Sequence, residues 1–273
     1  MQDHDQIIHG RESWEVPSYQ VSRLTEKKTK YCIVIPVINE GSRIGSLLRR
    51  MTVLKISQQA DIIIVDGGSS DDSLNFKTLE DNNVSTVLVK TGPGKLSAQL
   101  RCAYAFALDK GYDGIVTIDG NDKDDPVAIP LFIEELEKGA DFVQGSRFIG
   151  GGFAENTPTS RDFAIRYIHA PVLKYASGFP WTDTTQGFRA YSRKLLLDRD
   201  VSIFREVFST YELLAYLSYR APRLGFVCKE VGSSRRYPKG EIPTKISVLR
   251  GNLSVFKILI NACRGRYNPP HVT

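Results

Sequence analysis

The sequence lacks several features that would assign it to a membrane or to an oxidising compartment. No apolar run reaches the roughly 18–20 residues that a membrane span needs, and the polar N-terminus has no signal-peptide core. The four cysteines, Cys32, Cys102, Cys228 and Cys263, are scattered and have no metal-ligand spacing. We therefore expect reduced thiols in a cytoplasmic protein.

Common phosphate-binding and nucleophile motifs are also missing. A dinucleotide fold would place Gly-x-Gly-x-x-Gly after the first strand, where this chain has the polar turn 36–41. A P-loop fails around Gly94-Lys95, because Val89 and Leu96 stand where a glycine and a hydroxyl are required. An aspartyl-phosphate phosphatase would have a second Asp in place of Asn121. The four histidines indicate no Ser-His-Asp set.

What is present is the composition and patterning of an α/β protein. The chain has 273 residues, of which 41% are hydrophobic and 25% charged, as in an ordinary globular domain. Buried strands alternate with amphipathic helices, which predicts a mostly parallel, doubly wound sheet flanked by helices. The predicted strands are 31–38, 60–66, 84–90 and 113–119. After residue 140 the pattern is less regular: 140–148 is a strand that runs into a polar turn, 181–192 is a loop followed by a short strand, and 225–232 is a strand. The predicted helices include 96–110, 127–138, 160–177 and 210–221.

We expect one catalytic domain with two appendages. Residues 1–29 are polar and predict a loosely ordered arm, 30–245 form the domain, and 246–273 form a basic amphipathic extension. From Arg235 onward there are eight Lys or Arg and one Glu, so this tail is strongly basic. A helix over 246–264 either lies on an anionic membrane or packs on the domain. The Pro/Gly-rich segment 234–245 predicts a mobile loop.

Polar side chains follow each of the first four strands. Asn39-Glu40, Asp66, Lys95 and the acidic loop Asp119-Gly120-Asn121-Asp122 occupy these places. Because ligands of such sheets bind outside the carboxyl ends of the strands, these loops predict one site.

The acidic loop suits a divalent metal and a diphosphate. Asp119 and Asn121 project in the same direction along an extended turn, so both oxygens can reach one Mg²⁺ or Mn²⁺. Such an ion neutralises a nucleoside diphosphate as it leaves a sugar. Asp122 adds acidic density, while Asp124 and Asp125 either do the same or cap the next helix.

Several segments, in order and at suitable spacing, resemble the inverting family 2 glycosyltransferases with a GT-A fold. Within that family the chain is most similar to dolichol-phosphate mannose synthases and bacterial polyprenyl-phosphate glycosyltransferases. The likeness covers about residues 31–245. The segments are IVIPVINEGSRI, DIIIVDGGSSDDS, TIDGNDKDDP, VQGSRFIGGG, DTTQGFRAYSRKLL, YELLAYLSYRAPRLGF and SSRRYPKGEIPTK.

The resemblance implies a role for each matching residue. The implied nucleotide-sugar residues are Pro36, Val37, Asn39, Glu40, Asp66, Lys95, Asp119 and Gly120. The implied acceptor-phosphate residues are Arg147, Arg161, Gln186, Arg189, Arg235, Arg236 and Lys239. The implied catalytic residues are Asp119, Asn121, Arg147, Asp183 and Glu212, with Asp119, Asn121 and Asp122 at the metal. The chain departs from the family at Asn121, where a second carboxylate is usual, and in lacking membrane helices after the domain.

We therefore expect transfer of a sugar, with inversion, from a UDP- or GDP-sugar to a polyprenyl or dolichyl phosphate, for glycan or polysaccharide synthesis. Two alternatives stay open. One is a saccharide acceptor with Glu212 or Asp183 as general base, and the other is an inactive nucleotide-sugar-binding protein. We expect a peripheral protein on the cytoplasmic face of an anionic membrane that binds no nucleic acid, and a homo-oligomer is possible.

Overall fold

The computed structural model describes residues 8–238 and 250–270. Its strands are β1 (Tyr19–Leu24), β2 (Tyr31–Val37), β3 (Ala60–Asp66), β4 (Val84–Lys90), β5 (Gly114–Thr117), β6 (Phe142–Ser146), β7 (Phe153–Glu155), β8 (Arg189–Ser192), β9 (Cys228–Gly232) and β10 (Ser234–Arg236). Its helices are α1 (Ser42–Val53), α2 (Phe76–Asp81), α3 (Leu96–Asp109), α4 (Ile129–Glu137), α5 (Thr159–Ala164), α6 (Ala170–Ser177), α7 (Arg193–Leu197), α8 (Glu212–Arg223) and α9 (Arg250–Cys263). A π-helical segment, Ile165–His169, joins α5 to α6.

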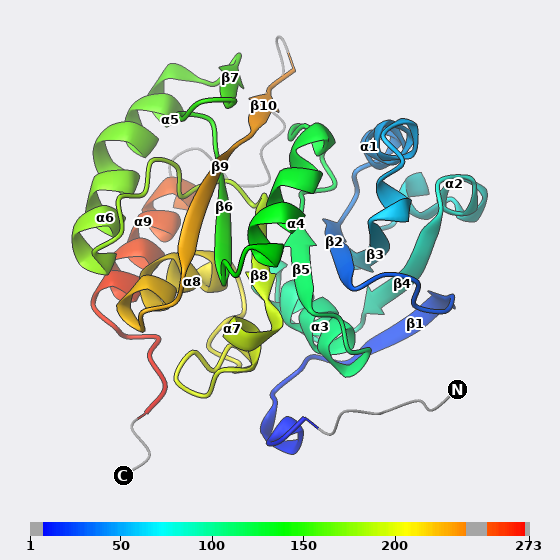
Figure 1. The fold of residues 1–273 in the computed structure, drawn as a ribbon, viewed down its shortest axis with the longest axis horizontal. Helices are drawn as coiled ribbons and strands as arrows, with labels where there is room; N and C mark the ends of the chain where they lie inside the picture. The colour runs from blue at the N-terminus through cyan, green and yellow to red at the C-terminus, as the bar shows by residue number, and fades with distance from the viewer. Residues whose placement is uncertain (1–7, 239–249, 271–273) are drawn as a thin grey trace.

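Eight strands form the central sheet, in the order β1-β4-β3-β2-β5-β8-β6-β9 (Figure 1). Strands β2 to β5 are parallel where they pair, while β8 runs antiparallel to both of its neighbours, β5 and β6. Strand β9 is parallel to β6, and β10 pairs with β7 in a separate two-stranded sheet. The predicted α/β architecture with a mostly parallel sheet is therefore confirmed.

The core lies on both faces of this sheet, which explains the continuous apolar strands in the sequence. Along β2, Cys32 and Val34 contribute to one apolar cluster with α3 and α8, whereas Ile33 and Ile35 contribute to another with α1 and α4. Successive side chains of a strand point to opposite faces, so a strand covered on both sides must be apolar throughout. Burying each such side chain contributes roughly 1.5–3 kcal/mol.

The N-terminal segment is more ordered than its composition predicts. Strand β1 forms an edge of the sheet and pairs antiparallel with β4. Before it, the ring of Trp14 stacks on Phe204 with centroids 3.7 Å apart. The prediction of a loosely ordered arm over 1–29 is thus wrong for Trp14 and for Tyr19–Leu24. A strand at the edge of a sheet is held by backbone hydrogen bonds, so its sequence needs no apolar periodicity.

The C-terminal helix packs on the domain. Ile258, Leu259 and Ala262 of α9 are buried, and the helix contacts α8 and α6. Part of the predicted mobile loop, residues 234–236, is β10 instead. Residues 239–249, with Lys239 and the predicted boundary at 245, lie outside the described residues, so the domain limits stay a prediction. Among the described helices none combines the length and the apolar character needed to cross a membrane.

Candidate functional site

The loop that carries Asp119 lies against the carboxyl end of β2. The Gly120 N–H donates to the carbonyl oxygen of Pro36 at 3.4 Å, and a Cβ at position 120 would come within 3.0 Å of Val37. The Gly67 N–H, after β3, donates to the carbonyl oxygen of Val37 at 2.8 Å. The ends of β2, β3 and β5 therefore meet at one edge, as predicted.

The side chain of Gln99, on α3, joins the carboxyl ends of β2 and β3. The Nε2 of Gln99 donates to the carbonyl oxygens of Val37 and Val65, at 3.0 and 3.1 Å. The neighbouring Lys95 has an exposed side chain, and its backbone N–H donates to Ser209 at 2.7 Å. Sequence reasoning missed Gln99, because a single polar residue on a buried helix gives no sign of which backbone groups it serves.

Polar side chains after β2 and β3 shape these two loops and join them to each other. Asp66 is buried, and its oxygens accept from the N–H groups of Gly68 and Ser69, both at 2.9 Å, and from the Ser69 hydroxyl at 2.5 Å. Asn39 accepts from the Ser70 N–H at 2.8 Å, and Glu40 pairs with Arg43 at 2.8 Å. These residues set the shape of the rim, while their contacts with a base or ribose stay a prediction.

The side chain of Asp119 lies next to segments that are distant in the sequence, around Gly187 and Arg235. Its side chain is 22% exposed, and its Oδ2 lies 3.5 Å from the Asn121 Nδ2 and 3.4 Å from the Arg235 Nη2. Gly187 passes so close that a Cβ there would stand 2.4 Å from the Asp119 Oδ1. Any larger residue at 187 would displace the carboxylate, which is a role that sequence reasoning did not assign to Gly187.

Arg235 is buried between two carboxylates. It donates to Asp124, which is fully buried, and lies beside Asp119. Burial disfavours the charged guanidinium, but Asp124 and then Asp119 outweigh it, so the pKa of Arg235 is raised. Burial also raises the pKa of Asp124, against the opposing effect of Arg235. Asp124 is therefore a partner of Arg235, and Asp125 alone is the helix cap, accepting from the Val127 N–H at 3.2 Å.

Tyr237 gathers three cations around its ring. The Lys123 ammonium, the Arg235 guanidinium and the Arg161 guanidinium lie 5.1, 5.6 and 5.7 Å from the ring centroid. Arg161 also donates to the tyrosine hydroxyl at 3.1 Å. Burial alone would raise the pKa of Tyr237, but Arg235 and Arg161 outweigh it and the pKa is lowered. Positive charge held beside the partly exposed Asp119 suits an anionic ligand such as a phosphate.

The arginine predicted to receive a phosphate is already paired. Arg147 and Asp183 form a buried bidentate ion pair, with Nε–Oδ2 at 2.7 Å and Nη2–Oδ1 at 3.0 Å. Arg147 also donates to the Thr185 hydroxyl at 2.9 Å, and within the described residues its Nη1 alone has no hydrogen-bond partner. Arg147 and Asp183 thus neutralise each other in this structure, and the predicted roles of Arg147 as a phosphate ligand and of Asp183 as a general base stay predictions.

Two further predicted phosphate ligands stabilise the fold. Arg189 is fully buried and donates to the carbonyl oxygens of Gln186, Leu214 and Thr184 at 2.7–2.8 Å. The Gln186 side chain is buried against Ser233, at 2.8 Å. Both residues hold the segment 184–189 in place, and their predicted contact with an acceptor phosphate stays a prediction.

The remaining predicted residues divide between the surface and local caps. Arg236 is exposed and pairs with Glu155. Glu212 begins α8 and accepts from the N–H and the hydroxyl of Thr210, at 2.6 and 2.5 Å, so it is not a free base. Asp122 accepts from Arg50 at 2.9 Å through its Oδ1, so this oxygen is engaged in an ion pair.

The donor set around Asp119 fits a metal bound through one protein carboxylate. No cluster of three His, Cys, Asp or Glu side chains suited to a metal occurs in the described ranges 8–238 and 250–270. The Asn121 oxygen accepts from the Lys123 N–H at 3.2 Å, and its nitrogen faces Asp119. Mg²⁺ commonly takes one or two protein carboxylates, with the rest of its ligands from substrate phosphates and water. Asp119 alone meets that requirement among the three predicted ligands.

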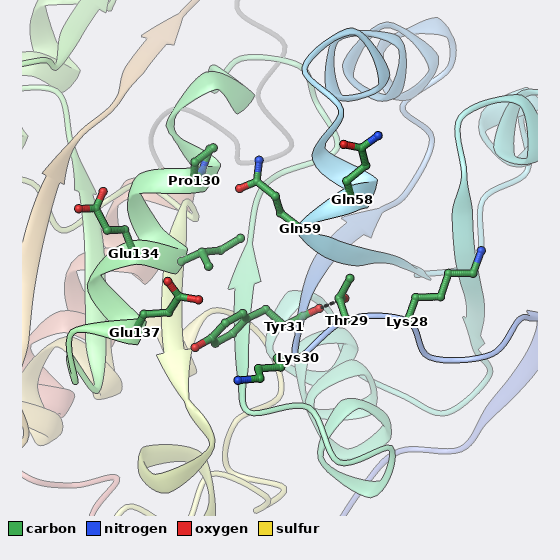
Figure 2. Close-up of a pocket in the computed structure, with 10 residues that line it drawn as sticks. Lys28, Thr29, Lys30, Tyr31, Gln58, Gln59, Pro130, Glu134 and Glu137 are labelled. Carbon is green, nitrogen blue, oxygen red and sulfur yellow. Dashed lines mark hydrogen bonds between the residues drawn. The ribbon is translucent and has the colours of Figure 1, made fainter. Parts of the chain in front are cut away.

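A separate hollow of about 530 Å³ opens at the opposite edge of the sheet (Figure 2). It lies where β2 begins, at Tyr31, between Lys28 and Lys30 on one side and Glu134 and Glu137 of α4 on the other. Amino ends of parallel strands are not where such sheets bind ligands. The hollow contains none of the residues predicted for the site.

Comparison with known proteins agrees with this geometry. The model of the family described as Glycosyl transferase family 2 matches residues 32–199. The undecaprenyl-phosphate mannosyltransferase of Micrococcus luteus is 29% identical over 74% of this chain and 85% of its own length. The polyprenol monophosphomannose synthase of Mycolicibacterium smegmatis is 27% identical over 73% and 74%.

A solved structure resembles the fold. Glucosyl-3-phosphoglycerate synthase from Mycobacterium tuberculosis, in complex with Mn²⁺, UDP and phosphoglyceric acid, matches with a TM-score of 0.58 and 18% identity, over 92% of this chain and 81% of that one. With the family match over more than half of the sequence and Asp119 at the carboxyl edge of the sheet, this chain belongs to glycosyl transferase family 2 and is a glycosyltransferase.

Proposed function

We propose that this enzyme transfers a sugar, with inversion, from a UDP- or GDP-sugar to the phosphate of a polyprenyl lipid. The observation that carries the proposal is the cationic cluster of Lys123, Arg161, Arg235 and Tyr237 directly beside Asp119. The relatives from Micrococcus luteus and Mycolicibacterium smegmatis carry names of polyprenyl-phosphate sugar transferases, which supports the same acceptor.

The reaction is a single in-line displacement. An oxygen of the lipid phosphate forms a bond to the anomeric carbon as the bond from that carbon to the donor diphosphate breaks. The bonding electrons leave with the diphosphate. A lipid phosphate is ionised near neutral pH, so no strong general base is needed, and catalysis rests on position and charge.

The residues of this chain divide the task. The backbone around Pro36, Val37 and Gly120 forms a fixed rim for the nucleotide. Asp119 would hold a Mg²⁺ or Mn²⁺, which when bound neutralises the diphosphate charge. Arg161, which donates to the Tyr237 hydroxyl, supplies a guanidinium group that favours an incoming phosphate over a neutral hydroxyl, while Arg235 holds Asp119 and Tyr237 in place beside it.

The contacts of the two candidate general bases, Asp183 and Glu212, favour a phosphate acceptor over a saccharide. Asp183 is fully buried in its pair with Arg147, and Glu212 is bonded to Thr210. A general base must be within hydrogen-bond reach of the hydroxyl that it deprotonates. A phosphate acceptor removes that requirement.

The test is nucleoside diphosphate release by the full chain. The pure protein is incubated with Mg²⁺ or Mn²⁺ and a panel of UDP- and GDP-sugars, with and without undecaprenyl phosphate. We expect one donor to give release that depends on the lipid phosphate and is lost in Asp119→Ala. No release from any donor, or release that requires a saccharide instead, would rule the proposal out.

A further inference from the structure

The outermost helix of the second half of the chain exposes an aromatic face. Helices α5 and α6, joined by their π-helical segment, form one continuous rod along the outside of the molecule (Figure 1). Phe163, Tyr167 and Tyr175 on this rod are 57%, 67% and 94% exposed, and Ile168 is 36% exposed. Ile168 and Tyr175 are seven residues, or about two turns, apart, so they share one side of the helix.

Exposed aromatic residues elsewhere in the described chain stand singly, as Phe76 does on α2. Here the rings of Phe163 and Tyr167 contact each other, with centroids 4.9 Å apart, and remain exposed. Aromatic residues gathered on one exposed face mark an interaction site more often than scattered ones do.

The charge on the same rod suits an anionic partner. Between 159 and 177 the chain has three cations, Arg161, Arg166 and Lys174, against the single carboxylate of Asp162. Arg166 is 46% exposed even in its pair with Asp162. His169 adds no positive charge, because burial lowers its pKa. Aromatic rings with flanking cations are typical of segments that lie in the interface of an anionic bilayer.

The rod is continuous with the candidate site. Arg161 stands two residues before Phe163 and donates to Tyr237, in the cationic cluster beside Asp119. Arg166 stacks on Phe148 at 3.9 Å, and the Arg147 guanidinium lies over the same ring at 5.3 Å. A lipid whose chain lies along this face would therefore present its phosphate to Arg161.

We propose that the face formed by Phe163, Tyr167, Ile168 and Tyr175, here called the aromatic face, docks the enzyme on an anionic phospholipid bilayer. The proposal rests on the proposed function for its purpose, since the acceptor is then a lipid. It also places the membrane contact on the α5–α6 rod and not on α9, whose residues Ile258, Leu259 and Ala262 are buried and which contacts α6 and α8.

The test compares the full chain with surface variants on vesicles of phosphatidylglycerol and phosphatidylcholine in equal parts, by co-sedimentation. Tyr167→Ser with Tyr175→Ser removes two large exposed rings, and we expect the partition coefficient to fall about tenfold or more. The control is Phe76→Ser, which removes a ring that is 57% exposed from α2. We expect it to bind within about twofold of wild type, since α2 is outside the aromatic face.

Turnover separates this proposal from the proposed function. With a short-chain, water-soluble prenyl phosphate, the double variant should release nucleoside diphosphate at the wild-type rate, and only its turnover on vesicle-borne acceptor should fall. If wild type turns over neither acceptor, the proposed function fails while vesicle binding still decides the aromatic face. Vesicle binding unchanged in the double variant, equal loss in Phe76→Ser, or a dimer broken by the double variant with vesicle binding intact would overturn the docking proposal.

Discussion

The two halves of this enzyme, before and after Gly120, form their parts of the candidate site from different kinds of contact. Up to Gly120, the rim consists of backbone groups and short side chains at the ends of parallel strands. Its loops are held by hydrogen bonds within a loop, as Asp66 holds 67–69, and between neighbouring loops, as Asn39 accepts from Ser70. Beyond it, long cations are buried against carboxylates from distant segments, as in Arg235 with Asp124 and Arg147 with Asp183. The first half supplies shape and the second supplies charge, and Asp119 stands where the two meet.

The largest expected effect is at that meeting point. Asp119→Asn keeps the size of the side chain and removes its charge, so both the metal ligand and the partner of Arg235 change at once. We expect nucleoside diphosphate release to fall at least about a thousandfold. The control is the melting temperature, which should shift by only a few degrees, since the side chain is partly exposed. Activity within tenfold of wild type would remove Asp119 from the centre of the site.

The second largest expected effect is a difference between the halves in the free energy of unfolding that an Asp→Asn substitution removes. Asp124→Asn leaves Arg235 buried with one carboxylate fewer, and we expect a loss of about 3–5 kcal/mol in the free energy of unfolding. Asp66→Asn, in the first half, should cost about 1–3 kcal/mol, since it weakens hydrogen bonds without isolating a buried charge. Asp125→Asn should cost less than about 1 kcal/mol, since Asn caps a helix about as well as Asp and only the exposed ion pair with Arg50 is lost. Urea unfolding measures all three, and equal losses at 124 and 66 would break the contrast.

A smaller effect is expected at Tyr237, where the second half organises its cations. Tyr237→Phe keeps the ring and removes the hydroxyl that Arg161 contacts. We expect the KM for the acceptor phosphate to rise about three- to tenfold with kcat little changed, as for the loss of one hydrogen bond to a charged group. An effect on kcat alone would contradict a role in holding the acceptor.

The same variant gives a pH test of the cationic cluster. Despite burial, Arg235 and Arg161 lower the pKa of Tyr237 in the folded state. The unfolded chain then binds more protons between the two pKa values, so folding becomes more favourable as the pH rises through that window. We expect the stability of wild type relative to Tyr237→Phe to increase towards pH 10 and to lose that increment as the pH falls. A difference that shrinks on the alkaline side would exclude cationic neighbours around the hydroxyl.

The smallest expected difference is in thiol reactivity, which should be equally low in both halves. Burial raises the pKa of Cys102, in the first half, and of Cys263, in the second, to about 11 in each case. Relative to an ordinary thiol of pKa 9.0, the thiolate near pH 8 is about a hundredfold scarcer, so both should alkylate slowly. Mass spectrometry after iodoacetamide treatment at pH 8 measures this. Rapid labelling of only one of them would indicate that its surroundings are open.

Sequence reasoning predicted the first half well for a physical reason. The strand period and the turns after each strand are local properties, so the segments that carry Pro36, Asp119 and Gly120 lie together at the carboxyl ends of the strands, as predicted, while their roles stay a prediction. The second half depends on contacts across more than a hundred residues, such as Arg235 with Asp119 and Asp124. No periodicity in the sequence indicates that Arg189 donates to backbone carbonyl oxygens or that Arg147 pairs with Asp183. Nor does it indicate that three cations surround the ring of Tyr237.

The most direct test of the central claim is the chemical identity of the product. Wild type, a donor sugar nucleotide and undecaprenyl phosphate should give a lipid heavier by one sugar residue, in equal amount to the nucleoside diphosphate released. Mass spectrometry measures the mass, and NMR measures the anomeric configuration, which should be inverted relative to the donor. A lipid of unchanged mass with every UDP- and GDP-sugar, or a product with retained configuration, would contradict the account.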